Sequence, residues 1–227
     1  YAVVGPGVTL GAGTRLKPHA VIERNAIVGP GCEIGVGAVI GGDPQDLKYR
    51  GEPTRVEVGE GTHIREYVTV NRGTVATGRT VIGRGCYLMS YAHVGHDCVL
   101  EDDVTLANAV QLGGHVHLES QSSIGGSSAV HQFARVGTWA FVGGGSRVAQ
   151  DVPPYAKAAG SPLKMYGINA VGLRRAGLSS ECRLALKHAF RILFNSDLTT
   201  SEAIDHLRAR EAGFPEVARL LDFFGET

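Results

Sequence analysis

The feature that most constrains this chain is an aliphatic residue that returns every six positions. From Val4 to Val148, 25 positions lie at this spacing, and 22 of them are Ile, Leu or Val. A second column, four residues later and running from Val8 to Val152, carries Ala, Cys, Ser, Thr or Val at all but two steps. Two columns that keep the same phase over so many repeats indicate one continuous repetitive fold.

A strict period of six excludes an α-helix, because 3.6 residues per turn would spread the aliphatic stripe around the helix. A solenoid of short strands and sharp corners fits the period. The aliphatic residue points inward, the small residue fills a corner, and the Gly that often follows the aliphatic residue relieves the turn. Such a fold needs little aromatic bulk, and the chain has 32 glycines and only 7% aromatic residues.

The repeats resemble those of the hexapeptide-repeat acyltransferases. That resemblance implies a left-handed parallel β-helix in which three hexads make up each coil. We therefore predict a mainly β fold with the β-helix over residues 1–153. Loop 41–57 is expected to protrude from it, because the sequence there is polar and holds two prolines. A shorter break at 71–79 is less informative.

The cysteines follow the same phase. Cys32, Cys86 and Cys98 fall in the small-residue column, and Cys182 lies beyond the repeats. We interpret the three cysteines of the column as compact apolar filler and not as a disulfide framework, which fits a reducing compartment.

Helical periodicity follows the repeats. We predict a linker and a small α-helical domain over residues 154–227. The expected cap residues are Ser179 and Ser180 for a helix through Phe194, Thr199 with Glu202, and Pro215 for a last helix through Phe224. A basic set there suits phosphate or an acidic protein, or is simply a solvated face: Arg174, Arg175, Arg183, Lys187 and Arg191.

Charge and hydropathy limit the function classes. Lys plus Arg equals Asp plus Glu at 22 each, so no overall field favours nucleic acid or an anionic membrane. No apolar run approaches the roughly 18 residues that span a bilayer, and we find no signal peptide. We expect a cytoplasmic protein without membrane insertion. Because Tyr1 already lies inside a repeat, an upstream piece is left open.

With three hexads per coil, residues i and i+18 stack about 4.8 Å from one another. Two such columns meet at one corner, where polar residues distant in sequence gather. They are His96, Gly114 and Gln132 in one column and Asp97, His115 and Phe133 in the other, with His93 and His131 beside them.

Three interpretations compete for this corner. It could be a polar column with satisfied hydrogen bonds, or a zinc site, although we find no ligand set spaced to close a tetrahedron and predict no metal. The third is general-base catalysis. His96 would take a proton from an attacking hydroxyl, Asp97 would hold the imidazole, and the Gly114 N–H would stabilise an oxyanion. That chemistry describes direct acyl transfer from a thioester.

Longer strings narrow the resemblance to the acyl-carrier-protein-dependent UDP-N-acetylglucosamine O-acyltransferases. They are QDLKYRGEPTRVEVG (45–59), SYAHVGHDC (90–98), LGGHV (112–116), SAVHQF (128–133), VAQDVPPY (148–155) and YGINAVGLRRAG (166–177). The resemblance implies transfer of an (R)-3-hydroxyacyl group from acyl carrier protein to the sugar 3-hydroxyl, the first step of lipid A synthesis. It also implies a homotrimer with sites between subunits, and no cofactor beyond the donor's phosphopantetheine arm.

The resemblance assigns roles residue by residue. His96 matches the general base, Asp97 its partner and Gly114 the oxyanion donor. The matching substrate-binding residues are Asp46, Lys48, His93, His115, His131, Gln132, Asn169 and Arg175. Gly144 falls where the family sets acyl length. The acceptor is left open between the ordinary sugar and its 3-amino analogue.

Three rival functions stay open at this point. One is the sister N-acyltransferase of the same pathway, which lacks the QDLKYRGEPTR loop and tends to carry Asn after the histidine. Another is a small-molecule acetyltransferase that uses acetyl-CoA. The last is a structural or ligand-binding β-helix, which would need neither His96 nor Asp97.

Overall fold

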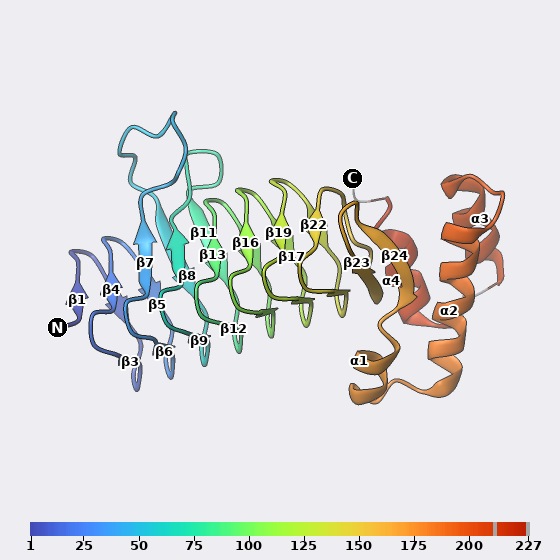
Figure 1. The fold of residues 1–227 in the computed structure, drawn as a ribbon, viewed down its shortest axis with the longest axis horizontal. Coiled ribbons are helices and arrows are strands. Elements are labelled where there is room, and N and C mark those ends of the chain that lie inside the picture. The colour runs from blue at the N-terminus through green and yellow to red at the C-terminus, as the bar shows by residue number, and fades with distance from the viewer. Residues whose placement is uncertain (211–212, 226–227) are drawn as a thin grey trace.

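The computed structural model describes residues 1–210 and 213–225, and its main body is a parallel β-helix (Figure 1). Short strands, most of them two residues long, form three sheets that run along the molecule. Helices follow at the C-terminal end. The predicted architecture, a β-helix of hexapeptide repeats followed by a helical region, is confirmed.

The sheets have eight, seven and nine strands. The first contains β1 (Val3–Val4), β4 (Val21–Ile22), β7 (Val39–Gly42), β10 (Thr69–Asn71), β13 (His93–Val94), β16 (Gln111–Leu112), β19 (Ala129–Val130) and β22 (Arg147–Val148). The second contains β2 (Thr9–Leu10), β5 (Ile27–Val28), β8 (Arg55–Val58), β11 (Arg79–Ile82), β14 (Val99–Leu100), β17 (His117–Leu118) and β20 (Arg135–Val136). The third contains β3 (Arg15–Leu16), β6 (Glu33–Ile34), β9 (His63–Ile64), β12 (Tyr87–Leu88), β15 (Thr105–Leu106), β18 (Ser123–Ile124), β21 (Phe141–Val142), β23 (Ala156–Ala159) and β24 (Lys164–Ile168).

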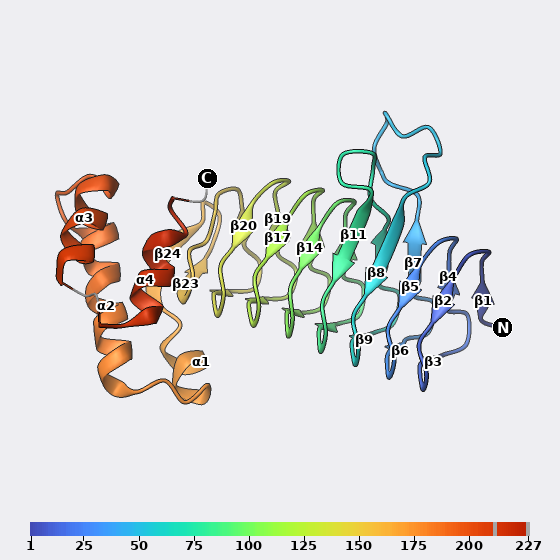
Figure 2. The ribbon, with the colours of Figure 1, turned by 180° about the vertical axis from the view of Figure 1, so that it is seen from behind.

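The strand register confirms the coil of three hexads. His93 pairs with Gln111, and Gln111 pairs with Ala129. Two earlier coils are longer. Val39 pairs with Thr69 because loop 43–54 extends the coil between them, and Thr69 pairs with His93 because segment 72–78 extends the next coil. Both excursions protrude side by side from one edge of the β-helix (Figures 1 and 2).

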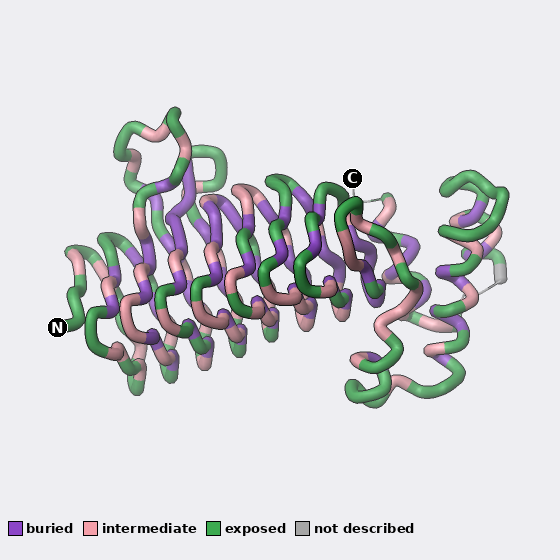
Figure 3. The backbone as a smooth tube through the Cα atoms, viewed as in Figure 1, coloured by how far each residue is buried: buried purple, intermediate pink, exposed green. Residues whose placement is uncertain are grey.

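The interior is a stack of aliphatic side chains with small residues between them. Ile22, Ile40 and Leu112 are buried, and purple segments mark this interior in Figure 3 from β4 onward, whereas the first coil is mostly exposed. Cys86 and Cys98 are also fully buried, and all four cysteines of the chain are free thiols. Cys32, Cys86 and Cys98 therefore serve as filler of the β-helix interior, as the phase of the repeat predicts.

The glycine that follows the aliphatic position has a different role from the one expected. We predicted that it relieves the turn, but positive φ occurs two residues later, at Gly7, Gly31 or Asp97 for example. A side chain on Gly29 would instead put its Cβ 2.8 Å from the backbone nitrogen of Glu60 in the next coil. Glycine is needed here because successive coils approach closely.

The segment after the repeats differs in part from the predicted linker. β23 continues the third sheet in parallel with β21, and β24 returns antiparallel to β23. The helices are α1 (Ala170–Arg175), α2 (Ser180–Asn195), α3 (Thr200–Arg210) and α4 (Pro215–Asp222). Within residues 1–210 and 213–225, no helix has both the length and the apolar character needed to cross a bilayer.

The expected cap residues lie at the helix starts. The Ser179 side chain accepts a hydrogen bond from the Cys182 N–H at the start of α2. Thr199 and Glu202 exchange hydrogen bonds before α3, which confirms the predicted capping box. Pro215 opens α4, although this helix ends at Asp222 and not at Phe224.

Helix α4 is fastened to the β-helix by a buried carboxylate. Glu119, whose side chain is 4% exposed, accepts hydrogen bonds from the Arg219 guanidinium at 2.6 Å and from the Thr138 N–H at 2.9 Å. Arg135 lies 3.5 Å from the same carboxylate and 4.3 Å from the centre of the Phe223 ring. These contacts set the helices against the last coils.

Candidate active site

One corner of the β-helix gathers the residues that the sequence stacks. The same corner of three successive coils carries His96 and Asp97, Gly114 and His115, and Gln132 and Phe133. The His115 N–H donates to the His96 carbonyl at 2.9 Å, and the Phe133 N–H donates to the Gly114 carbonyl at 3.1 Å. The predicted stacking of equivalent corner positions is confirmed.

His96 and Asp97 form a hydrogen-bonded pair. Nδ1 of His96 lies 2.7 Å from Oδ2 of Asp97. The Asp97 side chain has no exposed surface, whereas the imidazole is 15% exposed. A carboxylate at Nδ1 favours the tautomer with its proton there, which leaves Nε2 as the basic nitrogen.

Three threonines surround the other side of Asp97. The Thr74 N–H donates to Oδ1 at 2.9 Å and the Thr74 hydroxyl to Oδ2 at 2.8 Å. The Thr77 hydroxyl also donates to Oδ1, and the Thr80 hydroxyl accepts from the Asp97 N–H at 2.8 Å. Segment 72–78 therefore folds over the carboxylate and fixes its direction.

These threonines are not predicted from the sequence. Thr74 and Thr77 belong to the break at 71–79 that we had taken as less informative, and the longer coil there hides which residue it brings to Asp97. One signal was available, since Thr74 and Thr80 keep the small-residue phase through the break.

The surroundings shift the pKa values of two groups in the site. Burial alone would raise the pKa of the Asp97 carboxyl, but hydrogen bonds from Thr77, His96 and Thr74 outweigh it and lower the pKa below its ordinary value. Burial, and next the neighbouring His96, lowers the pKa of His93. Asp97 is thus an anion at neutral pH and His93 a neutral imidazole, whose Nδ1 lies 2.8 Å from the Thr69 hydroxyl.

A cleft of about 490 Å³ runs along this corner. Five of the predicted site residues line it: His93, His96, Gly114, His131 and Gln132. Gln45, from the protruding loop, lines it as well. The dyad therefore faces a space that a small substrate can enter.

The other predicted residues lie outside this cleft. His115 stacks on the Phe133 ring with centroids 4.5 Å apart and meets the His96 ring edge-on. Asp46 is half-buried and Lys48 exposed, both in loop 43–54 next to Gln45.

Three further predicted residues lie toward the C-terminal end. Asn169 caps α1 and donates to the Trp139 carbonyl at 3.0 Å. Arg175 is exposed in the last turn of α1, and a Cβ on Gly144 would lie 3.1 Å from the Gly126 carbonyl oxygen. A single chain does not bring these residues to the dyad's cleft.

Gly114 leaves room for the imidazole. A Cβ on Gly114 would lie 2.5 Å from Cε1 and 2.6 Å from Nε2 of His96, so the ring occupies the space above this residue. Among the described residues, the Gly114 N–H donates no hydrogen bond. A free N–H beside a basic nitrogen is the arrangement that an oxyanion requires.

The geometry also tests the metal alternative. Ligand atoms of His96, Asp97 and His115 lie within 4.8 Å of one another, a grouping that we did not expect from the sequence. Two ligands about 2.0–2.1 Å from one tetrahedral ion would lie roughly 3.4 Å apart. The 2.7 Å between His96 Nδ1 and Asp97 Oδ2 suits a shared proton instead.

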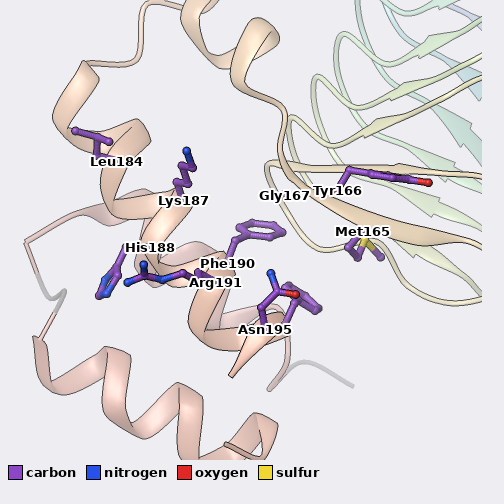
Figure 4. A pocket seen from close by; sticks show the side chains of 10 residues that line it. Met165, Tyr166, Gly167, Leu184, Lys187, His188, Phe190, Arg191 and Asn195 are labelled. Carbon is purple, nitrogen blue, oxygen red and sulfur yellow. The ribbon is translucent and has the colours of Figure 1, made fainter. Parts of the chain in front are cut away.

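A second cavity, of about 630 Å³, lies between β24 and α2 (Figure 4). Its walls are apolar at Met165, Leu184 and Phe190. Lys187 and Arg191, two members of the predicted basic set, lie one turn apart on α2 at its edge. This cavity, which we call the groove between β24 and α2, combines an apolar floor with positive charge.

A β-helix of hexapeptide repeats with a histidine–carboxylate pair at a corner cleft defines a hexapeptide-repeat acyltransferase. The family model of bacterial transferase hexapeptides matches residues 1–36 and 79–114, and that of UDP N-acetylglucosamine O-acyltransferase domain 2 matches residues 151–227. The chain belongs to the acyl-[acyl-carrier-protein]–UDP-N-acetylglucosamine O-acyltransferase family.

Relatives of that name cover nearly the whole chain. The enzyme from Thermodesulfovibrio yellowstonii is 46% identical over 224 residues, which are 98% of this chain and 87% of the relative. The enzyme from Syntrophobacter fumaroxidans is 44% identical over 229 residues, 100% of this chain and 89% of the relative.

Solved structures agree with the whole fold. The UDP-N-acetylglucosamine O-acyltransferase of Moraxella catarrhalis superimposes with a TM-score of 0.95 at 42% identity, over 98% of this chain and 87% of that one. The corresponding structure from Acinetobacter baumannii superimposes with a TM-score of 0.92 at 38% identity, over 97% of this chain and 91% of that one.

Proposed function

We propose that this chain transfers an (R)-3-hydroxyacyl group from acyl carrier protein to the 3-hydroxyl of UDP-N-acetylglucosamine, the first step of lipid A synthesis. Family membership supports the reaction. The observation that carries the mechanism is the 2.7 Å contact between His96 Nδ1 and Asp97 Oδ2 at an open cleft.

The chemistry needs one base and one anion-binding group. Nε2 of His96 accepts the proton of the sugar hydroxyl while the hydroxyl oxygen attacks the thioester carbon. The Gly114 N–H stabilises the negative oxygen of the tetrahedral intermediate. When the carbon–sulfur bond breaks, the phosphopantetheine thiolate takes the proton back from the imidazolium, and Asp97 stabilises the charged ring between the two transfers.

The buried carboxylate is suited to this role. Asp97 is held by Thr74 and Thr77 as well as by His96, so it does not rotate away when the imidazole becomes charged. Its lowered pKa keeps it ionised during turnover. Its own protonation is not part of the reaction.

We propose that the acceptor and donor bind along the same edge. Asp46 and Lys48 approach the sugar and phosphate from loop 43–54, His93, His131 and Gln132 line the path, and His115 supports the His96 ring. Gly144, packed against Gly126, lies where a larger side chain would shorten the acyl channel.

A homotrimer completes the site in this proposal. Asn169 and Arg175 would contact the nucleotide, yet neither lines the cleft of its own chain. A neighbouring subunit can supply them if the active sites lie between subunits. The four free cysteines fit the cytoplasm as the place of reaction.

The groove between β24 and α2 suits the protein donor. Acyl carrier protein is acidic and carries its acyl chain on a flexible arm, and Lys187 and Arg191 offer positive charge beside an apolar floor. We propose that the carrier docks here.

One experiment separates this proposal from its rivals. The protein is incubated with hydroxyacyl carrier proteins of several chain lengths and with UDP-N-acetylglucosamine or its 3-amino analogue, and the product is identified by mass. An O-acylated product is expected. Turnover only with the 3-amino analogue would make that sugar the acceptor. Turnover only with UDP-3-O-acylglucosamine, added as a third acceptor, would favour the N-acyltransferase, and turnover only with acetyl-CoA, added as a second donor, would favour the small-molecule enzyme.

The His96→Ala variant tests the base. Its trimer should assemble as in the wild type while acyl transfer is lost. Turnover retained in His96→Ala would remove His96 from its role as the base, whereas a wild-type protein that binds the sugar nucleotide without any turnover would favour a binding protein.

A further inference from the structure

Arg72 is a buried arginine close to the cleft that the reaction does not use. Its side chain is 2% exposed, and it lies directly after β10, where the two excursions leave the β-helix together (Figures 1 and 2). Nη1 donates to the Gly41 carbonyl at 2.8 Å and Nε to the Tyr49 hydroxyl at 3.1 Å. Nη2 forms an ion pair with the Asp43 carboxylate.

These contacts reach both arms of loop 43–54. Asp43 begins the loop, and its carbonyl also accepts from the Asn71 side chain at 2.8 Å. Tyr49 lies on the returning arm, where its hydroxyl donates to the Glu52 carbonyl at 3.0 Å. One guanidinium therefore joins the departing and the returning arm of the same loop.

Among the described residues, the other contacts that hold the loop at the solenoid lie at its departing end, where Arg24 pairs with Asp43 at 3.4 Å and Pro44 is buried. Leu47 at its tip is 97% exposed, and the segment around it is mostly solvated. Fixing the backbone of each residue costs about 1–2 kcal/mol. A buried cation that loses its partners is also costly. If the loop swung away, Arg72 would lose Asp43 and Tyr49, so the arginine resists that motion.

We propose that Arg72 is a positioning residue for the acceptor, which holds loop 43–54 so that Gln45 lines the cleft and Asp46 and Lys48 face the sugar nucleotide. This inference rests on the proposed function for the identity of the acceptor. It adds to that function a residue that touches neither substrate.

The test compares Arg72→Met and Arg72→Lys with the wild type. We expect the KM for UDP-N-acetylglucosamine, and its Kd by calorimetry, to rise at least about tenfold in Arg72→Met. The KM and Kd of Arg72→Lys should lie between those of the wild type and of Arg72→Met, because an ammonium can pair with Asp43 but cannot span both arms of the loop. The KM for the acyl carrier protein should change less than twofold.

Arg15→Met is the control for loss of an arginine elsewhere, since Arg15 is exposed and pairs with Glu33 of the neighbouring coil, outside loop 43–54 and the cleft. It should leave both KM values unchanged. A merely structural Arg72 would instead lower the melting temperature and the amount of active enzyme without moving the acceptor KM. That outcome would overturn the inference.

Two further variants separate the inference from the proposed function. Asp46→Asn and Lys48→Ala remove the loop's own contacts with the acceptor. If neither weakens acceptor binding, the proposed role of the loop fails, whatever Arg72 does. If both weaken it and Arg72→Met does not, the positioning role fails alone.

Tyr49→Phe serves if Arg72→Met does not fold, because it removes only one hydroxyl. It should raise the acceptor KM severalfold. Trypsin gives a substrate-free check, since Lys48 and Arg50 lie in the loop and both are exposed. We expect faster cleavage after Lys48 and Arg50 in Arg72→Met or Tyr49→Phe. Unchanged cleavage would contradict the proposal that Arg72 holds loop 43–54 in place.

Discussion

Gly114→Ala offers a direct test of the active-site geometry. The new Cβ would lie 2.5 Å from Cε1, 2.6 Å from Nε2 and 3.1 Å from Nδ1 of His96. Gly114 is not among the residues with positive φ, so alanine meets no backbone strain there. The nearest obstacle is the imidazole, unlike at Gly113, where a Cβ would meet the backbone nitrogen of Gln132 at 2.8 Å.

The magnitude follows from these distances. Carbon atoms in contact lie about 3.5–4.0 Å apart, so the His96 ring must retreat by about 1 Å. A shift of that size in a catalytic group can cost about 10²-fold in rate, which corresponds to about 2.7 kcal/mol of transition-state stabilisation. Retreat of the ring also strains its 2.7 Å contact with Asp97.

The assay is the initial rate of acyl transfer, measured together with the thermal unfolding midpoint. We expect kcat to fall about 10²-fold while the midpoint changes by only a few degrees. Gly213→Ala is the control, because no atom of the described residues lies within 4 Å of a Cβ placed there, and the rate should be unchanged. Wild-type turnover in Gly114→Ala would refute the placement of His96 over this glycine.

Other expectations concern stability and reactivity. Glu119→Ala should lower stability by about 1–3 kcal/mol, seen in the unfolding midpoint, because it removes the buried carboxylate that accepts from Arg219 and from the Thr138 N–H. Asp97 has a lowered pKa, so its contribution is present above the unfolded value of about 3.9 and is lost as pH falls through the folded value; the midpoint difference between wild type and Asp97→Asn should shrink on acidification below about pH 4. Burial raises the pKa of Cys98 to about 12 and that of Cys86 to about 11, so mass spectrometry should find neither alkylated at pH 8 until the protein unfolds.

The solenoid and its corner were predictable because, in a regular repeat, residues separated by one coil length in the sequence are neighbours in space. Once the coil length is known, His96 must lie beside Gly114, and no other long-range packing needs to be guessed. Helix caps such as Ser179 were accessible for a related reason, since capping joins residues three positions apart.

The rest could not be predicted, because it depends on where the repeat is broken. Thr74 and Asp97 meet across a coil that an excursion lengthens, so their separation of 23 positions matches no multiple of the period. Arg72 in segment 72–78 contacts Tyr49 in loop 43–54, so this hydrogen bond joins two segments that both leave the repeat. Strands β23 and β24 were taken for a linker because they lack the hexad pattern but complete the third sheet.

The ion pair between Glu119 and Arg219 joins residues one hundred positions apart. During synthesis the coils can stack before α4 is made, so Arg135 can pair with this carboxylate well before Arg219 does. A chain that stopped before α4 would keep the stacked coils, but the buried Glu119 carboxylate would lack its hydrogen bond from Arg219. Helix α4 therefore completes the hydrogen bonding of a coil that lies one hundred positions earlier in the chain.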